Sequence, residues 1–118
     1  MANRKKDIDG SFIEYKGVKY DLVFNLNVME EIQNEYGSVE AWGELVEASA
    51  EPKAKDIKFG FTAMLNEGID IYNEEHDDNR PFFTEKQVGR IISELGLNDA
   101  AKQLNKTVID STKSDEKN

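Results

Sequence analysis

Residues 56–75 read D-I-K-F-G-F-T-A-M-L-N-E-G-I-D-I-Y-N-E-E, and this stretch decides the fold. On a helix, at about 100° per residue, its large apolar side chains gather on one wide arc. The members of that arc are Ile57, Phe61, Met64, Leu65, Ile69, Ile71 and Tyr72. An arc wider than a simple surface stripe predicts a long central helix, over Asp56–Tyr72, that contacts several neighbouring elements.

Two glycines lie on or beside the apolar arc of this predicted helix. Gly60 and Gly68 each cost about 1 kcal/mol of helix propensity relative to alanine. We therefore expect another helix to approach closely at these positions. Phe59 lies on the far side of the helix, where an aromatic ring either forms a second packing layer or contacts a partner.

Length, charge and composition limit the classes to which this chain can belong. Its 118 residues suffice for one domain, and the absence of cysteine excludes disulfides and thiolate metal sites. A formal net charge of −9 argues against a nucleic-acid backbone or an anionic membrane as the main partner. No apolar run approaches the roughly 18 residues of a membrane span, and the lack of cysteine fits a cytosolic protein.

Residues 11–24 alternate apolar and polar side chains, which predicts a β-hairpin over Phe12–Phe24. A two-residue turn at Lys16-Gly17 sets its register. The expected pairs are Tyr15 with Val18, Glu14 with Lys19, and Ile13 with Tyr20. Because two strands alone are marginally stable, this hairpin needs helices behind its apolar face, and it leaves two edges open.

Phe12 and Val23 fall on the outer face of the predicted hairpin. Neither a proline nor a bulge-forming glycine guards its edges, so an edge is either covered by the protein's own tail or used for strand addition. We therefore expect self-association through the hairpin, with Phe12 and Val23 contributing apolar contacts.

Capping residues divide the rest of the chain into further helices. The expected N-caps are Asn27, Ser38, Thr84 and Asn98, and the expected stops are Gly37, Glu51-Pro52-Lys53 and Gly96. The resulting fold class is α+β and mostly α, with an N-terminal β-hairpin packed on a small bundle of about five helices. We expect this single domain to span residues 11–112, between a flexible tail at 1–10 and a flexible charged tail at 113–118.

Several large side chains have both a structural and a functional interpretation. Trp42 lies on the apolar side of a short helix and is interpreted as a core residue. Phe82 and Phe83 precede the Thr84 cap, and adjacent aromatics cannot both face one core. One of the two is expected to pack on Val88 as a hydrophobic staple, and the other is expected to be exposed.

Residues 74–80 read E-E-H-D-D-N-R and contain the single histidine, His76. A divalent-ion site is the functional interpretation, but the order lacks the alternating oxygen ligands and the glycine of a calcium loop. The segment is therefore interpreted as a solvated loop. No nucleophile elbow, phosphate-binding loop or dinucleotide fingerprint is present either. We expect no enzymatic activity, no cofactor and no metal site.

The order of these elements resembles a known family. The segments that carry the likeness are F-N-L-N at 24–27, E-Y-G-S at 35–38, Trp42, F-T-A-M-L-N-E-G at 61–68, P-F-F-T-E-K-Q-V-G at 81–89 and G-L at 96–97. Over about residues 18–112 this order resembles the tail assembly chaperones of long-tailed bacteriophages, which also occur in prophages of Gram-positive bacteria.

The resemblance implies a non-enzymatic protein of the host bacterial cytoplasm. Such chaperones bind the helical tape-measure protein before tail-tube assembly, help to recruit tail-tube subunits and are absent from the mature virion. The family also self-associates, which implies a homo-oligomer. Apolar residues outside the main faces, namely Phe59, one of Phe82 and Phe83, and Ile109, would then receive the client's helical stripe.

Two other classes of protein fit the same sequence. One is a structural tail-completion or connector protein, which would persist in purified particles, whereas a chaperone would not. The other is a small acidic regulator that binds a host protein.

Overall fold

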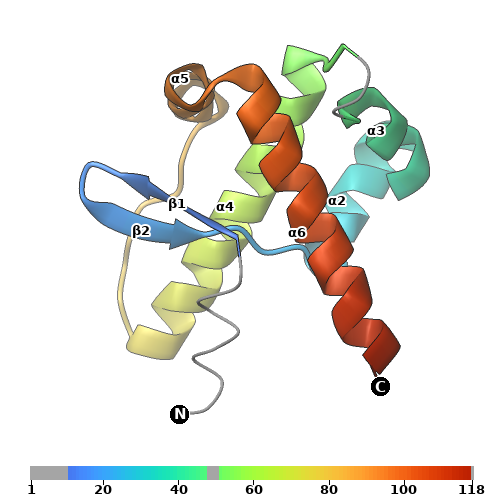
Figure 1. Ribbon diagram of the computed structural model, residues 1–118. Coiled ribbons are helices and arrows are strands. Elements are labelled where there is room, and N and C mark those ends of the chain that lie inside the picture. Colours follow the sequence, from blue (N-terminus) through green and yellow to red (C-terminus); the bar gives the residue numbers. More distant parts are fainter. Residues whose placement is uncertain (1–10, 48–50, 118) are drawn as a thin grey trace.

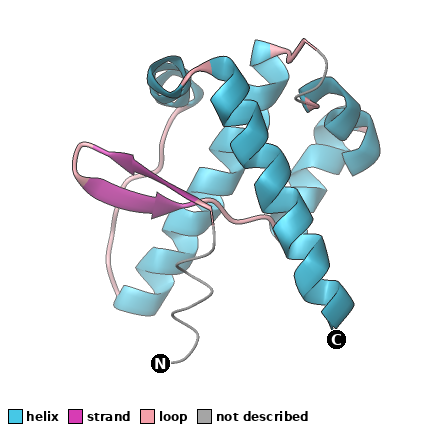
Figure 2. Cartoon of the chain, in the orientation of Figure 1, coloured by secondary structure: helices cyan, strands magenta, loops and turns pink. Residues whose placement is uncertain are grey.

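The computed structural model describes residues 11–47 and 51–117, with side chains described through Thr112. In chain order the elements are β1 (Phe12–Tyr15), β2 (Val18–Asp21), α2 (Leu26–Tyr36), α3 (Val39–Val46), α4 (Ala54–His76), α5 (Glu85–Leu95) and α6 (Leu97–Lys117). The predicted fold class is confirmed, since one antiparallel hairpin precedes five helices in the described chain (Figure 1) and helix dominates it (Figure 2).

Flexible tails were predicted at residues 1–10 and 113–118, the two ends of the chain. Residues 1–10 lie outside the described residues, so the expected flexible N-terminal tail does too. At the other end the backbone of α6 continues to Lys117, past residue 113, where the charged tail was expected to begin.

The hairpin has the predicted register. Phe12 pairs with Asp21, Ile13 with Tyr20, Glu14 with Lys19 and Tyr15 with Val18. Both turn residues, Lys16 and Gly17, have the positive φ that a tight two-residue hairpin turn requires (51° and 79°).

The second strand is shorter than predicted. It ends at Asp21 rather than at Phe24. Leu22 still donates across to the Ser11 carbonyl at 2.9 Å, and the chain then turns to the central helix, where the Val23 amide donates to the Met64 carbonyl at 3.2 Å. Val23 therefore belongs to the joint between the hairpin and α4, and its expected place on the outer face of the hairpin is wrong.

Helix α4 is the centre of the fold, and it contacts β2 and each of the other four described helices (Figure 1). Its arc is fully buried at Ile57, Phe61, Met64 and Leu65. The helix is longer than predicted at both ends, because it begins at Ala54 and because residues 73–76 form one more turn before Asp77 ends it in the left-handed conformation (φ 53°). His76 thus lies on a helix and not in a loop.

The two glycines of α4 admit two different neighbours. A Cβ at Gly60 would lie closer than 3.0 Å to a ring carbon of Trp42, so the expected close approach of a helix, α3, is confirmed there. At Gly68 the atom that a Cβ would strike is the carbonyl oxygen of Asp21. The element that approaches Gly68 is therefore the end of the hairpin and not a helix.

Four of the seven predicted caps and stops are confirmed, and the stop expected at Glu51-Pro52-Lys53 is wrong, because α3 already ends at Val46. The confirmed caps and stops are Ser38, Thr84 with its reciprocal partner Gln87, Gly37 and Gly96. Asn98 was wrongly expected to cap the last helix. Helix α6 begins at Leu97, because the Ala100 amide bonds back to the Gly96 carbonyl at 3.0 Å, which leaves no separate cap between α5 and α6.

The start of α2 also differs from the prediction. Asn25, and not Asn27, is its N-cap, with the side-chain oxygen accepting from the Val28 amide at 3.2 Å. Glu67 of α4 accepts from the amide groups of both Asn25 (2.8 Å) and Asn27 (3.0 Å). The side chain of Asn27 thus serves a contact between α2 and α4.

Candidate functional site

The six predicted interaction residues divide into two groups. Phe12, Phe82 and Ile109 are 39%, 55% and 54% exposed. Val23, Phe59 and Phe83 are half-buried. The exposed residues come from β1, from the loop between α4 and α5, and from α6, so the predicted residues are distributed over several elements.

Leu26 is an exposed apolar residue that the sequence analysis missed. It is 77% exposed and occupies the first position of α2. The signal in the sequence is its position, because it directly follows the true N-cap and precedes the periodic apolar residues, which begin at Val28.

Phe59 forms the second packing layer on the far side of α4. Its ring meets the ring of Tyr36 edge-on, with centroids 5.5 Å apart and planes at 76°. Asp56, which is buried, ties this layer to the core. Its carboxylate accepts from the Tyr36 hydroxyl at 2.5 Å, and its backbone carbonyl accepts from the Trp42 indole at 3.0 Å. Burial, and then the bond to Asp56, raise the pKa of Tyr36. Asp56 thus fixes the start of α4 against α2 through its carboxylate and against α3 through its backbone carbonyl.

Two asparagines of α4 hold the loop that carries Phe82. Asn66 accepts from the Phe83 amide (2.8 Å) and donates to the Phe83 carbonyl (3.0 Å). Asn73 accepts from the Arg80 amide (2.9 Å) and donates to the Arg80 carbonyl (3.1 Å). The two asparagines lie two helical turns apart on one side of α4. Each side-chain amide pairs with the loop backbone as a neighbouring strand would, so the loop is fixed on both sides of Phe82.

One ring of the aromatic pair is half-buried and the other is exposed, as predicted, whereas the expected staple onto Val88 stays a prediction. Phe83 is the inner residue, and its ring meets Tyr15 and Tyr20 of the hairpin edge-on at centroid distances of 5.9 and 5.0 Å. Phe82 is the outer residue. The loop therefore anchors the hairpin on α4 through one ring and presents the other to solvent.

The outer edge of β1 is partly covered by the chain itself. The Leu22 amide bonds to the Ser11 carbonyl at 2.9 Å, so the alternate residues Phe12 and Glu14 direct their backbone groups away from β2. Gln103 of α6 donates to the outward carbonyl of Phe12 at 2.6 Å. Of the two possibilities for this edge, cover by the chain itself and strand addition, the structure shows the first at Phe12, where a residue 91 positions later in the chain supplies the donor.

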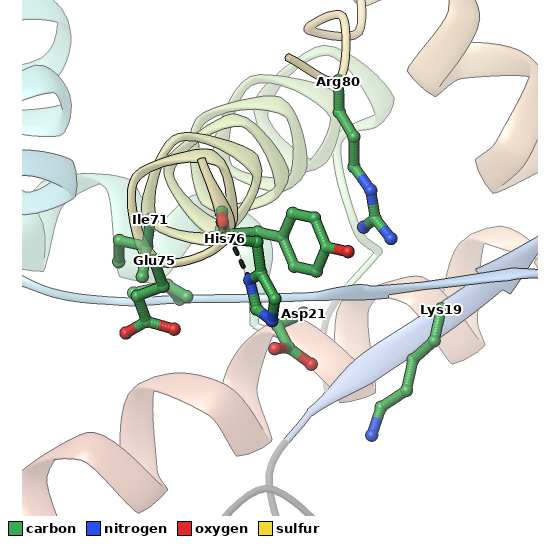
Figure 3. A pocket seen from close by; sticks show the side chains of 9 residues that line it. Lys19, Asp21, Ile71, Glu75, His76 and Arg80 are labelled. Carbon is green, nitrogen blue, oxygen red and sulfur yellow. Dashed lines mark hydrogen bonds between the residues drawn. The ribbon is translucent and has the colours of Figure 1, made fainter. Parts of the chain in front are cut away.

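A pocket of about 650 Å³ lies between the hairpin and the C-terminal half of α4. Its charged side chains come from three elements, with Lys19 and Asp21 on β2, Glu75 and His76 on α4, and Arg80 on the following loop (Figure 3). Charges of both signs therefore face the same space.

The ring of Tyr72 contacts two of the side chains that line this pocket, His76 and Arg80. The His76 ring stacks on it with centroids 4.0 Å apart, and the Arg80 guanidinium lies 3.6 Å from its centroid. His76 Nδ1 lies 3.0 Å from the Tyr72 carbonyl, so this nitrogen carries the proton and donates (Figure 3). These contacts hold the imidazole against its own helix.

That His76 belongs to no metal site stays a prediction. Over residues 11–47 and 51–112, no three or more of the usual metal-ligating side chains come together. We expect calcium, zinc and manganese to leave the melting temperature unchanged. A saturable rise in melting temperature that disappears in His76→Ala would reveal a metal site.

Comparisons with known proteins add no relative. Scans of family models, of curated proteins and of solved structures each give no match. None of the helices in the described part of the chain combines the length and the apolar character needed to cross a bilayer.

Proposed function

We propose that this protein is a tail assembly chaperone of a long-tailed bacteriophage. In the host cytoplasm it binds the tape-measure protein, helps to recruit tail-tube subunits and performs no catalysis. The observation that carries the proposal is that large apolar side chains stand exposed on fixed elements of an acidic domain. These side chains are Phe12, Leu26, Phe82 and Ile109.

Phe82 is the best placed of these side chains to anchor a client. Exposed aromatic residues are frequent energetic centres of interfaces. Asn66 and Asn73 fix the loop on both sides of it, so little conformational freedom remains to be lost when a client binds. A client helix with an apolar stripe is the kind of partner that such a side chain fits.

The net charge supports the same function. At −9, the chain helps to keep a complex with an apolar client dispersed. The resemblance in element order supports the tape-measure protein as that client, and the segments that carry the resemblance include the Phe82 loop.

Co-expression with the tape-measure gene tests the proposal. We expect the tape-measure protein to stay soluble and to copurify with the wild-type chain. Phe82→Ser and Ile109→Ser should lower the copurified amount, whereas Lys102→Ser, at another exposed position of α6, should not. A tape-measure protein that stays insoluble beside a folded wild-type chain would contradict the proposal.

Two further results would favour the alternatives. Recovery of the chain from purified particles would identify a structural tail protein. Capture of one host protein, without any binding of the tape-measure protein, would identify a regulator.

A further inference from the structure

A second hollow, of about 430 Å³, lies where α4, α5 and α6 meet. We name it the α4–α5 groove. Its lining includes Ala54, Lys55 and Lys58 from the start of α4, Gly89 and Ile92 from α5, and Leu97 from the start of α6. These three elements come together at the top of the molecule in Figure 1.

The floor of the α4–α5 groove is apolar. Ile92 is buried and Leu97 is half-buried. Gly89 adds no side chain, and a Cβ built there would already lie 3.4 Å from the Lys58 side chain. The hollow therefore exists because position 89 is a glycine, and any large side chain there would fill it.

One rim of the groove is positively charged. Lys55 and Lys58 are spaced i, i+3, so they lie on the same side of α4. Among the described side chains, those of residues 11–47 and 51–112, no carboxylate forms an ion pair with either lysine. The chain as a whole is negatively charged, with 24 acidic and 15 basic residues. The two unpaired lysines beside the apolar hollow therefore form a positively charged local surface on a negatively charged protein.

We propose that the α4–α5 groove docks an acidic amphipathic helix of a partner protein. An apolar side chain of that helix enters the hollow, and its carboxylates face Lys55 and Lys58. A hydrophobic groove between two packed helices is a common binding site for a third, amphipathic helix. A small molecule fits less well, because small-ligand sites bury most of their ligand, whereas Ala54 and Lys55 at this rim are exposed.

This inference concerns a surface and its chemistry, so it is tested without the tape-measure protein. The probe is a fluorescently labelled peptide of about 14 residues, long enough for several helical turns. It carries leucine on one face and glutamate beside that face. A matched peptide carries lysine in place of each glutamate.

Fluorescence anisotropy with the purified wild-type protein gives the first result. We expect the acidic peptide to bind saturably, with a Kd below about 100 μM, and the basic peptide to bind at least about tenfold more weakly. Raising the salt concentration should weaken the acidic peptide's binding, because added ions screen the lysines. Equal binding of the two peptides, or no saturable binding of the acidic one, would overturn the proposal.

Two sets of variants locate the binding site. Lys55→Glu/Lys58→Glu should weaken the acidic peptide's binding at least about tenfold. The control Lys102→Glu/Lys106→Glu makes the same change in net charge on α6 and should alter binding less than about threefold. Gly89→Leu fills the hollow without changing any charge, and it should weaken binding at least about fivefold. Thermal melts establish that each variant is folded.

The remaining outcomes are equally decisive. If Lys55→Glu/Lys58→Glu binds no worse than its control, or if Gly89→Leu binds as wild type does, the helix does not sit in this groove. If Lys55→Glu/Lys58→Glu abolishes self-association that the control retains, the occupant is a second copy of this chain and the proposal is overturned. A folded protein that binds the acidic peptide but not the tape-measure protein would refute the proposed function alone.

Discussion

Gly60→Ala should destabilise the protein, although alanine is the better helix former. Alanine gains about 1 kcal/mol over glycine in a helix interior. The new Cβ would lie closer than 3.0 Å to the ring of Trp42, which is 1% exposed and whose indole N–H is bonded to the Asp56 carbonyl at 3.0 Å. Because the ring cannot move away without breaking that bond, we expect the upper part of the overpacking range, about 2–3 kcal/mol. The net loss in the free energy of unfolding is then about 1–2 kcal/mol.

Gly43→Ala is the matched control. Gly43 also lies inside a helix, α3, and no atom lies within 4 Å of a Cβ built there. This variant should gain about 0.5–1 kcal/mol, so the two glycine-to-alanine changes are expected to have opposite signs.

Urea denaturation followed by far-UV circular dichroism measures both variants, with the slope m expected to stay constant. In a Trp42→Phe background the Gly60→Ala change should be neutral or stabilising, which gives a coupling energy of at least about 1 kcal/mol. If Gly60→Ala raises stability as much as Gly43→Ala does, the contact with Trp42 is not limiting and the reasoning is refuted.

Three further perturbations test other contacts. Asn66→Ala should lower the free energy of unfolding by about 1–3 kcal/mol, because it leaves the amide and carbonyl of Phe83 without partners. Amide hydrogen exchange at Phe83 should accelerate, and unchanged exchange would show that Asn66 does not hold the loop. Tyr36→Phe should change the dependence of stability on pH, because the raised pKa of Tyr36 makes the folded state hold the phenol proton more tightly than the unfolded state does. That stabilisation is complete below the unfolded pKa of about 10 and falls as the pH rises above it, so the advantage of wild type over Tyr36→Phe should shrink in denaturation series across that range. Phe12→Lys should weaken self-association through the hairpin in sedimentation over a concentration series; a monomeric wild type at high micromolar concentration, or equal assembly of the variant, would exclude that surface.

Local chemistry explains what the sequence predicted well. The hairpin register depends on the Lys16-Gly17 turn and on alternation over a few residues. The end of α2 depends on Gly37, and the start of α5 on the reciprocal contacts of Thr84 and Gln87. In each case the residues that decide the structure lie within four positions of one another, so one short window contains the whole cause.

Two of the features that the sequence did not reveal depend on distant partners, and one error has a local cause. Asn25 and Asn27 are both good N-caps in isolation, and their shared contact with Glu67 of α4 is invisible in a local window. The backbone partners of Asn66 and Asn73 become neighbours only after the loop folds back along α4. The polar residues 73–76 read as a loop because their hydrophilic side chains suit an exposed last turn equally well.

The candidate surfaces were only partly predictable for the same reason. Sequence reasoning established that one of Phe82 and Phe83 is exposed, but the choice between them depends on where the hairpin tyrosines lie. The α4–α5 groove depends on three elements that meet in space, and its glycine at position 89 has no distinguishing local pattern.

The hairpin's dependence on α4 has a consequence for synthesis on the ribosome. The hairpin is finished at Asp21, but the helix that covers its apolar face ends at His76. At about 5–20 residues per second, the delay between the two is on the order of 3–10 seconds. During that interval Ile13 and Leu22 have no core to enter, and an isolated two-stranded hairpin is marginally stable. The nascent chain therefore passes through a period in which its first apolar segment is open to other nascent chains, and slow translation of residues 22–76 would lengthen that period.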